Sequence, residues 1–173
     1  MRIIAGEHRG ARIFAPKGND TRPTSDRVRE AAFNLVGPVD RAVVLDLFAG
    51  SGAMGLEALS RGAASVAFVE SDRDACRTIQ RNLEKLRVTG ARVVQRDALQ
   101  ALAADRGTYD LILCDPPYGY GDHDRLGPYL ARALAPDGLL VYETAAREEP
   151  TVEGLRTRTS RTYGSARLTL LEH

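Results

Sequence analysis

The sequence lacks the features of a membrane-spanning, secreted or metal-binding protein. No stretch approaches roughly 18 uninterrupted apolar residues, and the N-terminus has no signal-peptide core, which predicts a cytoplasmic protein without a membrane partner. The only cysteines are Cys76 and Cys114, and they lack the spacing of metal ligands. We expect both to be reduced structural thiols. The three histidines lie far apart in the sequence, so no metal motif is predicted.

Lysine is scarce, and the charged residues are unevenly distributed. Of 24 basic residues only Lys17 and Lys85 are lysine, and arginine suits bidentate phosphate contacts and stacking on bases. Residues 1–29 carry seven basic and three acidic side chains, and residues 154–168 carry four basic and no acidic ones. The net charge of +1 therefore hides an acidic middle between two basic ends. A genome that favours arginine codons would explain the scarcity of lysine, but it would not explain why basic residues cluster toward the two ends of the chain.

Short apolar runs alternate with amphipathic segments from residue 42 onward, in a chain of 173 residues that is long enough for one substantial core. The runs predict parallel strands over 42–47, 65–69, 91–95, 109–114 and 139–143. The intervening segments predict helices over 53–60, 72–86, 98–104 and 125–134. This repetition indicates an α/β fold with a doubly wound, mostly parallel sheet. An antiparallel C-terminal hairpin, predicted over 155–161 and 166–171, brings the sheet to seven strands.

A small N-terminal extension is predicted over residues 1–40, ahead of a main domain over residues 41–173. Two short β-prone pieces separated by glycines suggest a β-hairpin over residues 2–14. Such a hairpin would leave Arg9 and Arg12 exposed, where they could contact phosphates.

The extension continues into a helix that starts after a polar loop. Its apolar residues follow helical spacing, and either Thr24 or Ser25 is expected to cap it. Arg22, Arg27 and Arg29 cluster at the start of this helix. These arginines either bind phosphates or form an ordinary solvent-exposed surface, and the sequence leaves both interpretations open.

A glycine-rich loop follows the first predicted core strand and opens a helix. Its glycines match the pattern G-x-G-x-x-G at Gly50, Gly52 and Gly55. A dinucleotide would place its pyrophosphate at the helix N-terminus, where the carboxylate of Asp46 would oppose it. Asp46 instead suits the ammonium group of a bound amino acid, which favours S-adenosylmethionine over the NAD of an oxidoreductase. Phe48, within the loop, is either a core residue or a cofactor contact.

Three more acidic residues, Glu70, Asp97 and Asp115, follow the ends of successive predicted strands. In a doubly wound sheet these ends share one edge, and ligands bind there where the strand order reverses. Glu70 could hold the two hydroxyls of a ribose, and Asp97 could accept from an adenine amino group. Capping of helices is the alternative role for both residues. Glu143 ends a strand on the same edge, and either a salt bridge or a substrate contact would explain it.

The run from Leu111 to Tyr118 reads as a buried strand that ends in a rigid loop, Asp-Pro-Pro-Tyr. The prolines fix the backbone, so the Asp115 carboxylate, the Pro116 carbonyl and the Tyr118 ring can hold one relative arrangement. Two acceptors beside a flat ring suit a planar substrate that carries an amino group. Alone, this motif could be only a turn.

The combined motifs resemble those of class I S-adenosylmethionine-dependent methyltransferases that act on exocyclic amines. They are Asp-Leu-Phe-Ala-Gly-Ser-Gly over 46–52, Val-Glu-Ser-Asp over 69–72 and Asp-Pro-Pro-Tyr over 115–118. The run Arg-Pro-Thr-Ser-Asp-Arg-Val-Arg-Glu over 22–30 resembles, more narrowly, the RsmD family of 16S rRNA (guanine(966)-N(2))-methyltransferases. This resemblance covers essentially the whole chain.

The resemblance implies a Rossmann-like methyltransferase fold, with S-adenosyl-L-methionine as cofactor and S-adenosyl-L-homocysteine as product. The active-site assignments of the family fall on Asp115, Pro116, Pro117 and Tyr118. The cofactor-binding candidates are Asp46, Phe48, Gly50, Gly52, Glu70 and Asp97. The candidate RNA-binding residues are Arg9, Arg12, Arg22 and Arg27. The implied partner is 16S rRNA, in the small ribosomal subunit or an assembly intermediate, and we expect the protein to be a monomer.

Two other functions remain open from the sequence. Asp-Pro-Pro-Tyr also serves methylation of adenine N6 in DNA, although the chain has no segment that resembles a target-recognition domain. A nucleic-acid-binding scaffold that retains a cofactor pocket without turnover is the second alternative. It is disfavoured because the acid and the aromatic residue of the loop are both present.

Overall fold

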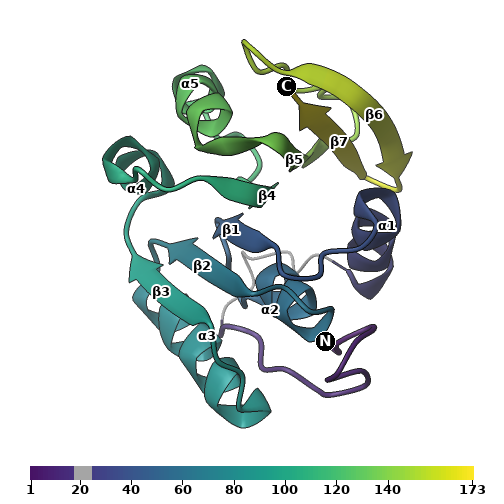
Figure 1. Cartoon of the computed structure of the whole chain (residues 1–173), viewed down its shortest axis with the longest axis vertical. Helices are drawn as coiled ribbons and strands as arrows, with labels where there is room; N and C mark the ends of the chain where they lie inside the picture. The colour runs from purple at the N-terminus through teal and green to yellow at the C-terminus, as the bar shows by residue number, and fades with distance from the viewer. Residues whose placement is uncertain (18–24) are drawn as a thin grey trace.

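A computed structural model describes residues 1–17 and 25–173 and has at its centre a seven-stranded sheet (Figure 1). The strand order is β3-β2-β1-β4-β5-β7-β6. Strands β1 to β5 run parallel, and β7 pairs antiparallel with both β5 and β6. The strands are β1 Val43–Leu47, β2 Ser65–Glu70, β3 Ala91–Gln95, β4 Tyr109–Cys114, β5 Leu134–Ala145, β6 Arg156–Tyr163 and β7 Ala166–Glu172. The predicted α/β fold, doubly wound with an antiparallel C-terminal hairpin, is confirmed.

Helices cover both faces of the sheet, as buried strands require. Helices α1 (Asp26–Val36), α2 (Ala53–Ser60) and α3 (Arg73–Leu86) pack on one face. Helices α4 (Ala98–Ala104) and α5 (His123–Ala133) pack on the other (Figure 1). Alternate strand residues serve the two cores, so the sheet separates two apolar layers. None of these helices in the described parts of the chain is long and apolar enough to cross a membrane.

The N-terminal segment reverses direction as predicted, but it is held by one antiparallel bridge, Arg2 to Arg12, rather than by two regular strands. Its backbone is hydrogen-bonded partly within the segment, as from the Ile3 N–H to the Ala11 carbonyl, and partly to helix α2, as from the Glu7 N–H to the Ser60 carbonyl. Gly6 has a φ of +85° and lies so close to α2 that a Cβ would be 1.8 Å from the Ser60 carbonyl oxygen. Two side chains of the segment itself, Ile3 and Ile13, are buried in the core.

Two of the predicted elements start two or more residues earlier than expected. Helix α5 begins at His123, before the predicted start, because the carbonyl of Asp122 accepts from the N–H groups of Arg125 and Leu126. Strand β5 begins at Leu134, where a turn was expected to precede residue 139. Leu134 pairs with Tyr109 across a register shift, so the irregular start of β5 still belongs to the sheet.

Candidate active site

The candidate site lies at the carboxyl edge of the parallel strands. Strands β1 and β4 are direct neighbours, with Asp46 opposite Leu113 and Leu47 opposite Cys114. Their following loops therefore leave the sheet side by side and bring the glycine-rich loop next to Asp115-Pro-Pro-Tyr118. Strand order reverses between these strands, which is where open α/β sheets bind ligands.

The glycine-rich loop is fixed by Glu70 at the end of β2. The Gly50 N–H donates to Oε2 of Glu70 at 2.8 Å, and the Asp72 N–H donates to Oε1 at 2.9 Å. Gly50 has a φ of +56°, and a Cβ added there would meet no atom within 4 Å. Gly55 instead packs tightly, since a Cβ would lie 2.3 Å from the Phe68 ring. Gly50 thus borders open space, whereas Gly55 allows α2 to approach the sheet.

Asp46 lies beneath this loop and is only 3% exposed. Its Oδ2 accepts from the N–H of Gly55 at 2.9 Å, in the first turn of α2. Burial raises the pKa of the Asp46 carboxyl well above its usual value, and the nearby carboxylates of Asp115 and Glu70 raise it further. A cation bound at this point would relieve the conflict between these negative charges.

The predicted ribose and adenine acids both have structural partners. Glu70 organises the glycine-rich loop, and Asp97 is the N-cap of α4, where its Oδ1 accepts from Gln100 N–H at 3.0 Å. Helix capping is therefore realised for Asp97. A carboxylate has about four lone-pair sites, so neither set of contacts uses up its acceptor capacity. Asp97 is exposed and Glu70 half-buried, so both remain accessible to a ligand.

Asp115-Pro-Pro-Tyr118 turns sharply out of β4. Asp115 is half-buried, Pro116 is buried, and Tyr118 is 57% exposed. The carbonyl of Pro117 accepts from the Tyr120 N–H at 3.1 Å, which closes the turn. The motif thus presents an aromatic ring to solvent while its carboxylate stays at the edge of the sheet.

Tyr120 is a site residue that the sequence analysis missed. Its ring packs edge-on against Phe48 at 5.1 Å and against His123 at 5.3 Å. Its buried hydroxyl has no hydrogen-bond partner among the described residues. Burial raises the pKa of Tyr120, and the carboxylate of Asp97 contributes next. The aromatic repeat Tyr118-Gly-Tyr120 was the available signal.

The Phe48 contact joins the two loops of the site. Phe48 is half-buried and adopts a φ of +58°, which is uncommon for a residue other than glycine. Its ring packs against Tyr120, so it serves the apolar core and also borders the site. The unpaired hydroxyl of Tyr120 beside Asp97 is the kind of orphaned group that a polar ligand would satisfy. These residues fit an adenine-bearing cofactor.

Three of the four predicted RNA-binding arginines belong to the described residues. Arg9, Arg12 and Arg27 are exposed, and Arg22 lies outside the described residues. The side chain of Arg29 is fully buried. It therefore neither binds phosphate nor faces solvent, and both interpretations were wrong for this residue.

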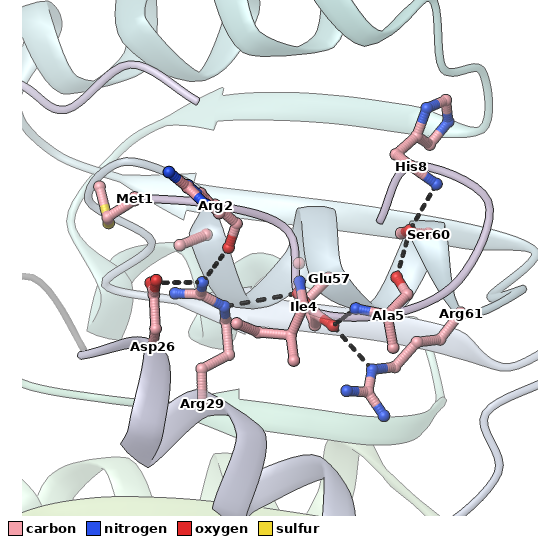
Figure 2. Close-up of polar contacts among 12 residues, drawn as sticks. Met1, Arg2, Ile4, Ala5, His8, Asp26, Arg29, Glu57, Ser60 and Arg61 are labelled. Carbon is pink, nitrogen blue, oxygen red and sulfur yellow. Dashed lines mark hydrogen bonds and ion pairs between the residues drawn. The ribbon is translucent and has the colours of Figure 1, made fainter. Parts of the chain in front are cut away.

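Arg29 is buried because it joins the N-terminal segment to helix α2 (Figure 2). Its Nη2 donates to the Arg2 carbonyl oxygen and to Oδ1 of Asp26, the latter at 2.9 Å. Its Nε lies 3.5 Å from Oε2 of Glu57, whose side chain is also fully buried. The arginine cluster seen in the sequence therefore contains one structural member.

Comparisons with known proteins decide the family. The family model described as Conserved hypothetical protein 95 matches residues 1–172. "Ribosomal RNA small subunit methyltransferase D" of Escherichia coli K12 is 44% identical over 122 residues, which are 70% of this chain and 62% of the relative. The chain belongs to the RsmD family. The predicted family is confirmed, although this match spans less than two thirds of the relative's length.

Two further comparisons extend the RsmD family match to nearly the whole chain. "Putative rRNA methyltransferase YlbH" of Bacillus subtilis is 41% identical over 95% of this chain and 94% of its own length. The structure titled "Putative methyltransferase yhhF from Escherichia coli" superposes with a TM-score of 0.88 at 36% identity, covering 100% of this chain and 97% of that one. Both support a Rossmann-like methyltransferase fold.

Proposed function

We propose that the protein transfers a methyl group from S-adenosylmethionine to the exocyclic N2 amine of a guanine in 16S rRNA. The observation that carries this proposal is the meeting of Asp115-Pro-Pro-Tyr118 with the glycine-rich loop at one edge of the sheet. The RsmD-family relatives named as rRNA small subunit methyltransferases support the substrate class. The proposed target is the small ribosomal subunit or its assembly intermediate, in the cytoplasm, and the proposed active form is a monomer.

The residues that would hold the cofactor are those lining the carboxyl edge of β1 to β3. S-adenosylmethionine supplies an electrophilic methyl group when bound. Asp46, at the base of the loop, would neutralise the ammonium group, which explains why a costly buried carboxyl is retained. Glu70 would accept from the ribose hydroxyls and Asp97 from the adenine amino group. Phe48, Gly50 and Gly52 would shape the loop around it.

Asp115 and Pro116 would activate the amine by position. The lone pair of an aromatic exocyclic amine is delocalised into the ring, which makes the nitrogen a poor nucleophile. If the Asp115 carboxylate and the Pro116 carbonyl each accept one N–H, the nitrogen can pyramidalise and direct its lone pair at the methyl group. The methylated nitrogen is strongly acidic, so Asp115 or water can take its proton. Pro117 keeps the loop rigid.

Tyr118 would recognise the target base by stacking. Its exposed ring suits a flat base, and such contacts are worth about 1–3 kcal/mol. A guanine must leave its own stack to reach this position, so an unpaired or flipped guanine is the expected substrate. The N-terminal extension over residues 1–40, with Arg9, Arg12, Arg22 and Arg27, would bind phosphates around it.

The experiment is transfer of labelled methyl to small-subunit rRNA by the wild-type protein and the Asp115→Asn variant. Asparagine keeps one acceptor but lacks the charge. We expect at least a 100-fold lower rate, in the range of losing one key electrostatic contact. Binding of S-adenosylmethionine by calorimetry should persist in the variant. An Asp115→Asn protein as active as the wild type would contradict the mechanism.

A further inference from the structure

Phe14 holds an aromatic ring at the surface beside two cations. The ring is 39% exposed, an unusual position for phenylalanine. The guanidinium carbon of Arg81 lies 4.3 Å from the ring centroid, and Nζ of Lys85 lies 4.8 Å from it. Both cations belong to α3 and are exposed. Neither forms an ion pair with a carboxylate of residues 1–17 or 25–173, so their charges remain available to a partner.

The main chain of Phe14 is connected to the glycine-rich loop of the candidate site through Asn82. Asn82 is fully buried and bonds both main-chain groups of Phe14, accepting from its N–H at 2.7 Å and donating to its carbonyl at 3.0 Å. The same Asn82 amide donates to the carbonyl of Ser51, in the glycine-rich loop, at 3.1 Å. A single side chain therefore connects the surface ring to the loop that borders the candidate cofactor site.

Further contacts fix the rest of the segment that carries Phe14. Lys85 Nζ donates to the Arg12 carbonyl at 2.6 Å. Ser60 Oγ accepts from the His8 N–H and donates to the Ala5 carbonyl, and Glu57 accepts from the N–H of Ala5 (Figure 2). Because these anchors lie along the segment, the ring has a fixed position relative to the methyl-transfer edge.

We propose that Phe14, Arg81 and Lys85 form a second RNA contact, which binds an unpaired nucleotide outside the active site. Single-stranded RNA is recognised by stacking of bases on aromatic rings and on guanidinium planes. Phe14 and Arg81 supply both surfaces, and Lys85 supplies a charge for a phosphate. An acidic protein would use the cations but not the stacking surface, so RNA is the better fit. This inference rests on the proposed function, in which RNA is the substrate.

The test measures binding of a fluorescently labelled transcript of small-subunit rRNA across a range of salt concentrations. Phe14→Leu keeps an apolar side chain and the main-chain bonds but removes the ring. We expect about a fivefold or greater loss of affinity, the lower end of the value of one stacked base. Arg81→Ala with Lys85→Ala should remove the guanidinium stacking surface and reduce the slope of log affinity against log salt by about 0.7, which corresponds to the one phosphate that Lys85 would contact.

Arg106→Ala is the control, because it removes one exposed cation from the loop between α4 and β4, and α4 packs on the opposite face of the sheet from α3. Thermal unfolding and S-adenosylmethionine binding would establish that each variant is folded. Wild-type affinity in Phe14→Leu, or an unchanged salt slope in the double variant, overturns the proposal. A wild-type protein that binds the transcript but transfers no methyl would overturn the proposed function, while the Phe14→Leu affinity would still decide this inference.

Discussion

At the scale of single residues, Asp46 bears the greatest electrostatic conflict of the candidate site. It is buried, and the carboxylates of Glu70 and Asp115 lie near enough to raise its pKa beyond the effect of burial. A carboxylate with a raised pKa destabilises the folded protein once it ionises, because the unfolded chain holds that charge in water. Such a residue persists where its charge serves binding.

We therefore predict that Asp46→Asn is more stable than the wild type at neutral pH but binds S-adenosylmethionine more weakly. Asparagine can still accept from Gly55 N–H without a buried charge. Losing a charge-assisted hydrogen bond of about 1.5–3 kcal/mol corresponds to a roughly 10- to 150-fold weaker affinity. Thermal unfolding and calorimetry measure the two effects.

The pH dependence of this prediction has a definite sign. Because the pKa of Asp46 is raised in the folded state, its protonated form contributes to the free energy of unfolding. This stabilisation is complete below the ordinary pKa of 3.8 and is lost as pH rises through the raised pKa. The advantage of Asp46→Asn should therefore grow with rising pH and disappear in acid. Asp137→Asn removes an exposed charge and is the control. A variant less stable than the wild type at neutral pH would argue against this account of Asp46.

The sequence predicted the placement of the acidic candidate residues better than it predicted burial. Asp46, Glu70, Asp97 and Asp115 lie at one edge because the strand ends of a doubly wound sheet meet there. Arg29 was not recognised as buried because its partner, Glu57, lies on another helix, and no local pattern connects the two. Tyr120 was missed for a similar reason, since its contact with Phe48 arises only from the pairing of β1 with β4.

At the scale of elements, helix α2 connects the glycine-rich loop to the N-terminal segment. Glu57 accepts from the N–H groups of Ile4 and Ala5 at 2.9 and 3.0 Å and pairs with Arg61 at 2.8 Å. Arg29 approaches the same carboxylate (Figure 2). The Glu57 side chain of α2 is thus one of the main anchors of the N-terminal segment.

We predict that Glu57→Gln lowers the free energy of unfolding by about 3–5 kcal/mol, the usual cost of breaking a buried ion pair. The neutral glutamine amide removes the buried carboxylate that faces the Arg29 guanidinium. Urea unfolding measures the loss, and hydrogen exchange should show the amides of Ile4 and Ala5 less protected.

Glu172→Gln is the matched control for that change, because it weakens ion pairs with two exposed arginines of the C-terminal hairpin, Arg156 and Arg158. Surface pairs contribute about 0–1 kcal/mol, so its stability should stay near that of the wild type. Equal unfolding free energies for the two variants would show that Glu57 does not anchor the segment.

Most elements were predictable because their signals are local. Helices α2 and α4 and strands β3 and β4 have the predicted bounds, set by short apolar runs and clear turns. Strand β5 was predicted too short because Pro136 and Gly138 indicate a turn, and only pairing with β4 extends the strand through them. The N-terminal hairpin was overestimated because its backbone finds partners on α2.

At the scale of the whole molecule, the sheet provides a rigid edge and the surface provides the proposed RNA contacts. The acidic residues gather at the carboxyl ends of β1, β2 and β4, where they suit a cationic cofactor and an amine substrate. Basic residues are more numerous toward the two ends of the chain. This separation would let phosphates bind at the periphery without meeting the acids of the site.

The most direct test of the central claim is nucleoside analysis of small ribosomal subunits after methyl transfer by this protein. The subunits should come from a strain that lacks its own RsmD-family enzyme, so that the target base is unmodified. Our account predicts labelled N2-methylguanosine at a single position of 16S rRNA, formed at least 100-fold more slowly by Asp115→Asn. Label in adenine or in protein, or no label in any acceptor, would contradict it.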